Sequence, residues 1–508
     1  MFCGGIKSES ARDGSRALDS GGDDTTILGE LKVHSSFTHA ASPTSHSAPA
    51  DKDSSSWARK LFVCLWLFLF FFEGAYLWRL GNGLNYWADP HAEADTLRAA
   101  EGYVAEGLDA NHLLPRLLYG HRFPNDGTVK DHLDSQGLVP SRFREDFPAE
   151  MTDPNKWVTT HCPPGADLIN GLMARTFGVD PIWRLRLFPV TAGLFALAYF
   201  FRTIVRAWGV QCGALIAAAV VALPMVLLWL PSLHFQGYAL SLVLVQSSLL
   251  IRQLWIRERQ GFVFLPMLFL LGLIQGLLSW DHLFLVSLLA LPWWLLRRAE
   301  GANPPFSGLF WAVVAPATGL ALAHILHFWM AARELHGWQA AFGEFHRTAA
   351  ERGGVGEGAT GHLRYVLKSL YLYARWCFQP KHNTNFGPFF AMLLFVAIPT
   401  VIFSATEIKF SLRAANRRWQ INLIWPGSRN PLVPLAGALL VSTIWLVAMP
   451  QHTVGNSHVT VHHLAILYIC MAVIVARSLQ FRAGERPLTI DSDGRSGDVS
   501  VFAGRPAF

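Results

Sequence analysis

The sequence predicts an all-α polytopic membrane protein, with about ten transmembrane helices and a large first extracytoplasmic loop that carries amphipathic helices. Composition is the first observation behind this prediction. The chain has 508 residues, of which 52% are hydrophobic and 15% are charged, whereas a soluble domain usually carries about 25% charged residues. The second observation is a series of long apolar runs, and the third is the placement of basic residues between them.

The apolar runs set the domain organisation. A transmembrane helix needs roughly 20 apolar residues, and a first run of that kind covers residues 60–80. Residues 1–56, rich in Ser, Asp, Gly and Thr, predict a disordered cytoplasmic tail. Residues 57–480 form the predicted membrane domain, and 481–508 a second cytoplasmic tail. The further predicted spans are 187–206, 212–231, 236–254, 262–279, 283–296, 308–330, 387–405, 432–449 and 461–476.

Basic residues alternate along this series and predict the orientation. The connections at 202–206, 252–259, 297–298, 409–418 and 477–482 carry arginine or lysine, whereas those near Pro231, Asp281 and 451–463 carry none. Because cytoplasmic loops carry the excess of Lys and Arg, both termini are predicted to be cytoplasmic. Residues 81–181 and 331–386 are then the two large outer loops. A bacterial plasma membrane and an endoplasmic reticulum membrane both fit this pattern.

Charge and cysteine usage exclude two other classes. The net charge of +6 follows the predicted cytoplasmic connections, so it does not indicate nucleic-acid binding. The six cysteines form no Cys-X-X-Cys pair, which argues against a zinc or redox motif. Cys162 and Cys377 lie on the same predicted outer side, and we consider a disulfide between them as a hypothesis.

The two outer loops have different sequence patterns. In the first, Leu168, Ile169, Leu172, Met173 and Phe177 recur at helical spacing and predict an amphipathic helix on the membrane surface. The second contains a glycine cluster at 353–358. That cluster does not follow a predicted strand, so we interpret it as a flexible loop over a site and not as a nucleotide-binding loop.

Three acidic residues follow the first span and are the main candidates for chemistry. Asp89, Glu93 and Asp95 lie near the predicted outer membrane surface. One interpretation is that a carboxylate here acts as general base, since partial burial raises its proton affinity. The other is structural. If a helix covers 89–106, then Asp89 caps it before Pro90, while Glu93 and Asp95 are solvated.

Two further positions are candidates for substrate contact. Asp281 separates two apolar runs at the outer surface, where an ionisable residue has a functional interpretation and an equally simple one as a polar turn. His458 and His462 have helical i, i+4 spacing, which is compatible with a metal, with phosphate or sugar hydroxyls, or with a neutral loop. No third ligand lies nearby, so no metal site is assigned, although a divalent metal stays open.

Several short motifs in the first 210 residues resemble a known superfamily. They are Arg98-Ala99-Ala100-Glu101, Glu106-Gly107, His161-Cys162-Pro163-Pro164-Gly165, Phe177-Gly178, and Arg184-Leu185-Arg186-Leu187-Phe188-Pro189 at the start of a span. Together with one span and a long acidic outer loop, they resemble the GT-C integral-membrane glycosyltransferases. The protein O-mannosyltransferase and aminoarabinose-transferase group is the nearest. The resemblance covers about residues 58–210, and beyond them it depends on hydropathy alone.

The resemblance implies sugar transfer from a polyprenyl-phosphate donor at the outer or lumenal face. Members carry an Asp-Glu pair after the first span, and Glu93 matches its second half. A lysine of some members, placed near the donor phosphate, corresponds here to Cys162, so Lys156 and His161 are the candidates to replace it. The arginine at the start of the second span corresponds to Arg184 or Arg186.

The predicted function is therefore transfer of a sugar from a polyprenyl-phosphate-linked donor to a lipid, glycan or protein acceptor. Oriented cations would stabilise the charge of the departing phosphate. The expected partners are the lipid-linked donor and membrane lipids, with no nucleic acid. One alternative is a transporter or flippase of a lipid-linked sugar, for which Pro224 and Pro316 interrupt spans. Another is a structural membrane subunit.

Overall fold

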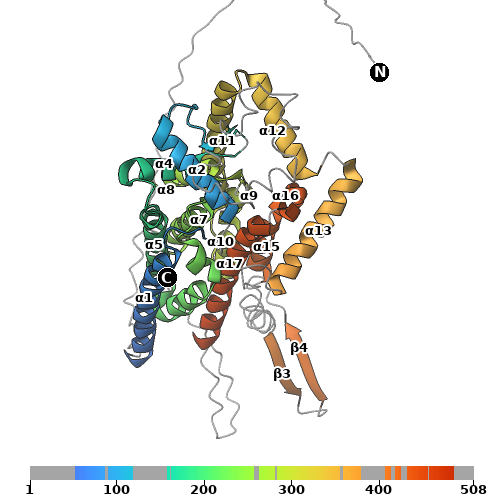
Figure 1. Cartoon of the computed structure of the whole chain (residues 1–508). Coiled ribbons are helices and arrows are strands. Elements are labelled where there is room, and N and C mark those ends of the chain that lie inside the picture. Colours follow the sequence, from blue (N-terminus) through green and yellow to red (C-terminus); the bar gives the residue numbers. More distant parts are fainter. Residues whose placement is uncertain are drawn as a thin grey trace, which may run out of the picture. The chain divides into compact units, whose positions relative to one another are not determined.

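The computed structural model describes residues 52–85, 90–117, 157–160, 162–256, 263–280, 283–354, 358–378, 407–413, 418–424, 432–455 and 457–484. All of these residues belong to one compact unit. Helices dominate it (Figure 1), as the composition predicts. The regular elements in chain order are α1 (Lys52–Leu80), α2 (Pro90–Glu106), β1 (Arg116–Leu117), β2 (Trp157–Val158), α4 (Gly165–Phe177), α5 (Trp183–Val221), α6 (Pro224–Trp229), α7 (Phe235–Ile251), a π-helical turn (Arg252–Ile256), α8 (Phe264–Leu278), α9 (Leu283–Leu288), α10 (Ala290–Ala299), α11 (Phe306–Glu334), α12 (Trp338–Gly353), α13 (Gly358–Phe378), β3 (Glu407–Arg413), β4 (Arg418–Ile424), α15 (Leu432–Ala448), α16 (Pro450–Gly455) and α17 (Ser457–Gly484).

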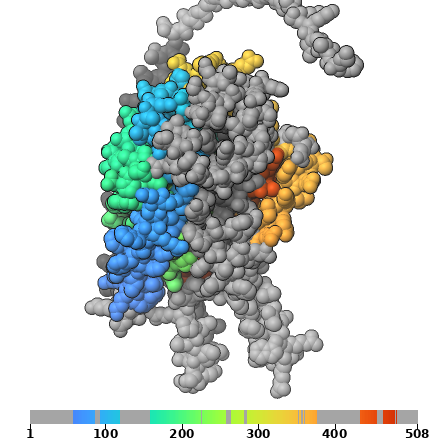
Figure 2. Space-filling model, in the orientation of Figure 1, coloured from blue at the N-terminus to red at the C-terminus, as the bar shows by residue number. Residues whose placement is uncertain are grey.

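Four stretches of helix in the described part of the chain are long and apolar enough to cross a membrane, namely Ser56–Leu80, Trp183–Val221, Phe235–Ile256 and Phe306–Glu334. Shorter apolar helices cover Phe264–Leu278, Leu432–Ala448 and His463–Arg477. Helix α1 lies along one face of the molecule (Figure 2), and its side chains Phe70, Phe71 and Trp78 are 68%, 68% and 89% exposed. Such an apolar surface fits a membrane protein, because lipid and not water can cover it.

Helix α5 is a helical hairpin and not one straight rod. Its 39 residues would extend about 58 Å if straight, nearly twice the thickness of a hydrocarbon core. Gly209 breaks it, with φ 84° and ψ 166°, a conformation that favours glycine. A Cβ atom on Gly213 would lie 2.6 Å from Cγ2 of Val205, so the chain folds back on itself here. The first arm covers the span predicted at 187–206, whereas the second arm ends at Val221 and the separate helix α6 covers part of the rest of the span predicted at 212–231.

Helices α8 and α11 make the closest helix pair through small residues. A Cβ atom on Gly272 would lie 2.1 Å from the carbonyl oxygen of Pro316, and one on Gly319 would lie 2.0 Å from that of Phe269. A Cβ on Gly276 would likewise meet Ala323 at 2.7 Å. Small residues that let two backbones approach this closely are typical of helix packing inside membranes.

The ends of the helices gather in two groups. At the first end, Gln480 donates a hydrogen bond to the carbonyl of Trp208, while Arg477 and Trp255 both donate to Glu300. These residues come from positions predicted to face the cytoplasm. Apolar helices that reverse direction at each connection bring such positions together, so the contacts agree with the predicted alternation.

The opposite end gathers the positions predicted to lie outside. Arg186 donates to the carbonyls of Gly83 and Pro231, and a Cβ atom on Gly165 would lie 2.6 Å from the carbonyl oxygen of Leu277. These contacts join the beginning of α5 to the ends of α1 and α6, and the beginning of α4 to the end of α8. The candidate functional residues lie here.

The later predicted spans and the second outer loop agree with the structure only in part. The span predicted at 283–296 is two helices, α9 and α10, because Pro292 fits the first turn of a new helix but not a helix interior. The span predicted at 387–405 lies outside the described residues. The second outer loop contains helices α12 and α13, separated at the glycine cluster, where Gly354 and Gly358 have φ values of 69° and 76°. About ten membrane crossings stay a prediction.

Two antiparallel strand pairs accompany the helices. Strand β1 pairs with β2 beside α2, with Arg116 opposite Val158. Strands β3 and β4 form a hairpin in register from Glu407 opposite Ile424 to Arg413 opposite Arg418. The basic run at 409–418 was expected to be a loop, and its alternating pattern of polar and apolar residues explains the strands.

Candidate functional site

The structure describes some of the predicted site residues and not others. Asp89, Lys156, His161 and Asp281 lie outside the described residues. His458 and His462 lie on helix α17, whose backbone is described there but not these side chains. Glu93, Asp95, Arg184 and Arg186 are described together with their surroundings.

Glu93 and Arg186 form an ion pair that water does not reach. Both side chains are 0% exposed. Two guanidinium nitrogens of Arg186 donate to the two carboxylate oxygens of Glu93, at 2.7 and 2.8 Å. The carboxylate also accepts hydrogen bonds from the backbone N–H groups of Asn85 and Leu233. The pair thus joins the first turn of α2, the beginning of α5 and the connections after α1 and α6.

This geometry gives Glu93 and Arg186 a positioning role in the described conformation. A general base needs a lone pair that faces the acceptor, and both oxygens of Glu93 already face Arg186 and backbone donors. The Nη atoms of Arg186 are equally occupied, since they also donate to Pro231 and Gly83. The predicted roles of these residues in chemistry stay predictions. The remaining described acid of the predicted group is Asp95.

Asp95 lies two residues further along α2 in an open position. Its side chain is 41% exposed, and its carboxylate accepts a hydrogen bond of 2.7 Å from Arg98, which is 1% exposed. The same face of α2 meets helix α4, where Asp167 lies in the first turn. Asp95 and Asp167 are close enough for the charge of one to affect the pKa of the other.

The carboxyl of Asp167 has an environment suited to proton transfer. Its pKa is raised to about 7, mainly by burial; the neighbouring Thr96 hydroxyl lowers the pKa, and the negative charge of Asp95 raises it. Its side chain nevertheless keeps some exposed surface. A carboxyl that titrates near neutral pH and touches solvent can take a proton from an acceptor hydroxyl.

The packing of α4 explains why Asp167 is held there. Gly171 lets α4 approach α2 closely, because a Cβ atom at this position would lie 2.4 Å from the ring of Tyr103. Asn170 is buried and donates to the carbonyl of Leu233 at 2.7 Å, which also fixes α4 to the connection after α6. Helix α4 covers the residues predicted to form an amphipathic helix, and its buried face carries Asn170, Gly171 and Ala174; its place on the membrane surface stays a prediction.

Asp167 is not among the candidate residues predicted from the sequence. The sequence feature that could have indicated it is the Pro-Pro-Gly motif of the first outer loop, because Asp167 follows Pro164 of that motif by three residues. Nothing in the sequence indicates that Asp95, 72 positions away in the chain, lies beside it, and that neighbour is part of what raises its pKa.

Arg184 lies at the opposite end of α4 from Asp167. It is exposed, lies over the ring of Trp183 at 5.9 Å, and donates to the carbonyl of Phe177 at 3.5 Å. Helix α4 rises by about 15 Å between Asp167 and Phe177. The structure therefore does not bring Arg184 next to the Asp95 and Asp167 carboxyls.

A second polar cluster lies near the beginning of α4. Trp280 follows α8 and stacks on His324 of α11, with ring centroids 4.6 Å apart. His327 and Phe345 also contact Trp280, at 5.9 and 5.0 Å. Both ring nitrogens of His324 are buried, and no described residue hydrogen-bonds to them. These nitrogens can therefore accept a hydrogen bond from a hydroxyl-rich ligand or donate one to it.

Among the described residues, no group of three or more His, Cys, Asp or Glu side chains is placed to hold a metal ion. Because the side chain of Cys377 lies outside the described residues, a disulfide with the thiol of Cys162 stays a hypothesis. The thiol lies at the turn before α4, and the helix itself is held by packing. Comparisons with protein-family models, with curated proteins and with solved structures give no significant match.

Proposed function

We propose that this protein is a multi-pass membrane glycosyltransferase of GT-C type, with its site at the extracytoplasmic face and both termini in the cytoplasm. It moves a sugar from a polyprenyl-phosphate-linked donor to a lipid, glycan or protein acceptor. The observation that supports this best is the carboxyl pair of Asp95 and Asp167 at one end of a set of apolar helices, with the pKa of Asp167 at about 7. The resemblance of the first 210 residues adds to it.

In the proposed reaction Asp167 is the general base. Its carboxylate takes the proton of an acceptor hydroxyl, whose oxygen forms the new bond to the anomeric carbon of the sugar. The bond from that carbon to the phosphate oxygen breaks, and polyprenyl phosphate leaves with the electron pair. Burial keeps the proton affinity of Asp167 high, and the negative charge of Asp95, which Arg98 holds in place, adds to it.

Binding of the lipid-linked donor is supported by the apolar surface of α1. The outer face of α1 is apolar and exposed, as expected if long isoprenoid lipids reach the site through the membrane. Stabilising the departing phosphate needs cations. Lys156 and His161 remain our candidates, with Arg184 at the other end of α4.

The test is to measure release of free polyprenyl phosphate. Purified full-length protein in detergent is incubated with a panel of polyprenyl-phosphate sugars and a crude acceptor extract, and the lipid products are counted by mass spectrometry. We expect release by wild type and a loss of about 100-fold or more in Asp167→Asn, the usual contribution of a general base. Asp109→Asn is the matched control, because Asp109 is an exposed acid in the same outer segment.

The pH profile gives a second readout. A base must be deprotonated to act, and the pKa of Asp167 is about 7, so release should rise as the pH passes from 6 to 8. Asp95→Asn removes the neighbouring negative charge, which should shift this rise to lower pH. Full activity of Asp167→Asn, with an unchanged pH profile, would refute the assignment of the base.

One observation favours transport without chemistry. Glu73 of α1 is 2% exposed, and neither of its carboxylate oxygens has a hydrogen-bond partner among the described residues. Ionisable residues buried in membrane helices often mark a transport pathway. If every donor is tried and no polyprenyl phosphate is released, flipping of the same donors in liposomes becomes the decisive measurement.

A further inference from the structure

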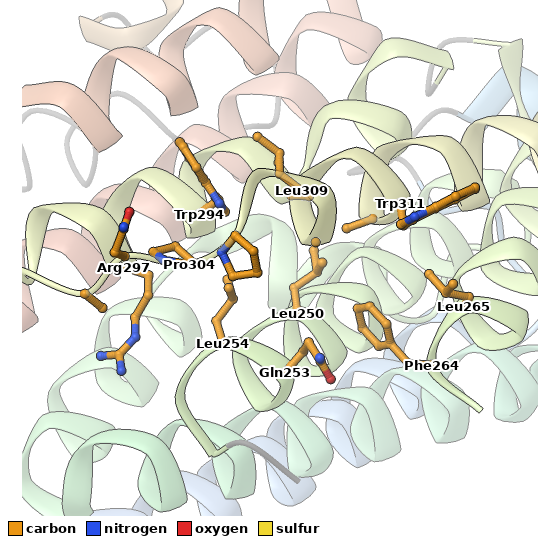
Figure 3. A pocket seen from close by; sticks show the side chains of 16 residues that line it. Leu250, Gln253, Leu254, Phe264, Leu265, Trp294, Arg297, Pro304, Leu309 and Trp311 are labelled. Carbon is orange, nitrogen blue, oxygen red and sulfur yellow. The ribbon is translucent and has the colours of Figure 1, made fainter. Parts of the chain in front are cut away.

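A cavity lies at the end of the molecule opposite to the carboxyl pair. It has a volume of about 380 Å³ and lies between α7, the π-helical turn, α8, α10 and the beginning of α11 (Figure 3). Sites for small molecules usually measure about 300–1,000 Å³. The cavity is therefore large enough for part of a ligand, and it belongs to the end that the basic connections assign to the cytoplasm.

The lining of this cavity has one cationic end and one apolar end. Arg297 and Trp294 lie toward one side in Figure 3, and Phe264, Leu265 and Trp311 lie toward the other. Among the described residues that line it, Arg297 is the charged one and none is acidic. An amphiphile with an anionic head and a hydrocarbon chain matches this division.

The side chains at the cationic end can donate hydrogen bonds to a ligand. Trp294 is 8% exposed, and its indole N–H is buried with no partner among the described residues. A buried donor without a partner costs about 1–3 kcal/mol, which an acceptor oxygen in the cavity would offset. Arg298 lies over the ring of Trp294 at 4.9 Å and adds positive charge beside it.

Arg297 is able to bind an anion because Glu300, the acid that it contacts, already accepts shorter hydrogen bonds from other residues. Glu300 accepts a hydrogen bond of 2.6 Å from Trp255 and one of 2.7 Å from Arg477, whereas its contact with Arg297 is longer, at 3.3 Å. With Arg298 nearby, the local charge stays positive after Glu300 is counted.

Between the two ends, an irregularity in the backbone contributes to the lining. Helix α7 continues into the π-helical turn, Arg252–Ile256, and this turn contributes Gln253 and Leu254 to the lining. Short π-helical segments are rare and are often found at functional sites. Leu250 and Leu309 continue the apolar surface toward Phe264.

We propose that this cavity binds an anionic phospholipid of the cytoplasmic leaflet. Its phosphate accepts hydrogen bonds from Arg297 and from the indole N–H of Trp294, and part of one acyl chain lies along Leu250, Leu254 and Phe264. Such a lipid would hold the ends of α7, α8, α10 and α11 together, and it is separate from the proposed sugar site.

Binding is measured by native mass spectrometry of the full-length protein in detergent, with 1-palmitoyl-2-oleoyl phosphatidylglycerol or the phosphatidylcholine of the same chains added. We expect phosphatidylglycerol to bind more tightly, and Arg297→Gln to weaken it about tenfold, as for loss of one charge-assisted hydrogen bond. Arg297→Lys should restore part of the affinity. Inorganic phosphate should not compete, because it lacks the acyl chain.

Two matched controls make the result specific. Arg297 lies over the ring of Trp255 at 5.7 Å, and Arg333 at the far end of α11 lies over Trp329 at 5.9 Å, so Arg333→Gln is its matched control. Ala312→Leu fills the cavity, while Ala321→Leu changes an exposed residue on the same helix. We expect only Arg297→Gln and Ala312→Leu to lose binding. Equal binding of phosphatidylglycerol by Arg297→Gln and Arg333→Gln, or displacement by inorganic phosphate alone, would overturn the proposal.

Discussion

At the scale of single residues, Glu93 and Arg186 determine how the outer end of the molecule is held. Taking two charges out of water is expensive, and their attraction compensates only when the geometry is good and the remaining groups are hydrogen-bonded. Here the carboxylate accepts four hydrogen bonds from Arg186, Asn85 and Leu233. Removing one partner leaves the other as an isolated charge in the core.

This gives a prediction that separates a positioning role from a base. Glu93→Gln should destabilise the protein by about 3–5 kcal/mol, because Arg186 stays buried and loses its counter-charge. Changing both residues to methionine should recover much of that loss. Thermal unfolding of the purified full-length protein in detergent measures both effects.

The control for this prediction is another acid on α2. Glu106 also pairs with an arginine, Arg116, but the two side chains are 28% and 24% exposed, so Glu106→Gln should cost only about 0–1 kcal/mol. If Glu93→Gln unfolded like wild type and yet lost sugar transfer, Glu93 would be the base after all.

The sequence allowed Glu93 and Arg186 to be chosen as candidates, but not to be paired. They are separated by 93 positions, and each was assigned to a different part of the chemistry. Asp167 shows the same difficulty from the other direction. Its residue type is ordinary, and the property that distinguishes it comes from burial against α2 and from the charge of Asp95.

At the scale of the elements, the most constrained contact is that of α8 with α11. The fifteen residues of α8 are nearly all apolar, so the hydrophobic pattern predicted the helix but no preferred face. Only Gly272 and Gly276, four positions apart, mark the surface on which α11 packs. By contrast, the break in α5 was predictable, since Gly209 lies between two apolar runs.

We predict that Gly272→Ala loosens this helix pair. The added Cβ atom would lie 2.1 Å from the carbonyl oxygen of Pro316, and a backbone atom cannot give way as a flexible side chain can. The expected loss is about 1–3 kcal/mol, visible as a lower thermal midpoint in size-exclusion chromatography after heating. In Gly308→Ala, on α11, the nearest contact would be 3.8 Å from Pro305, so this control should be neutral or slightly stabilising.

At the scale of the whole molecule, the ends of the helices form two groups, one of positions predicted to be cytoplasmic and one of positions predicted to lie outside. The basic connections predicted which positions share a side, and contacts such as Gln480 with Trp208 and Arg186 with Pro231 join positions of the same side. This segregation follows if every apolar run, including the hairpin at Gly209, reverses the direction of the chain. The pattern alone does not give the packing partners, because lipid-facing and buried apolar side chains look alike in sequence.

The proposed orientation makes a prediction about access from the two faces of the membrane. Thr176 on α4 and Ser307 on α11 are exposed and lie at opposite ends. In a background with the six native cysteines replaced, Thr176→Cys should react with a membrane-impermeant maleimide in sealed right-side-out vesicles. Ser307→Cys should react only after permeabilisation. The reverse result would put the carboxyl pair on the cytoplasmic face and exclude an extracytoplasmic reaction, whereas labelling of both in sealed vesicles would show that the two ends do not lie on opposite sides.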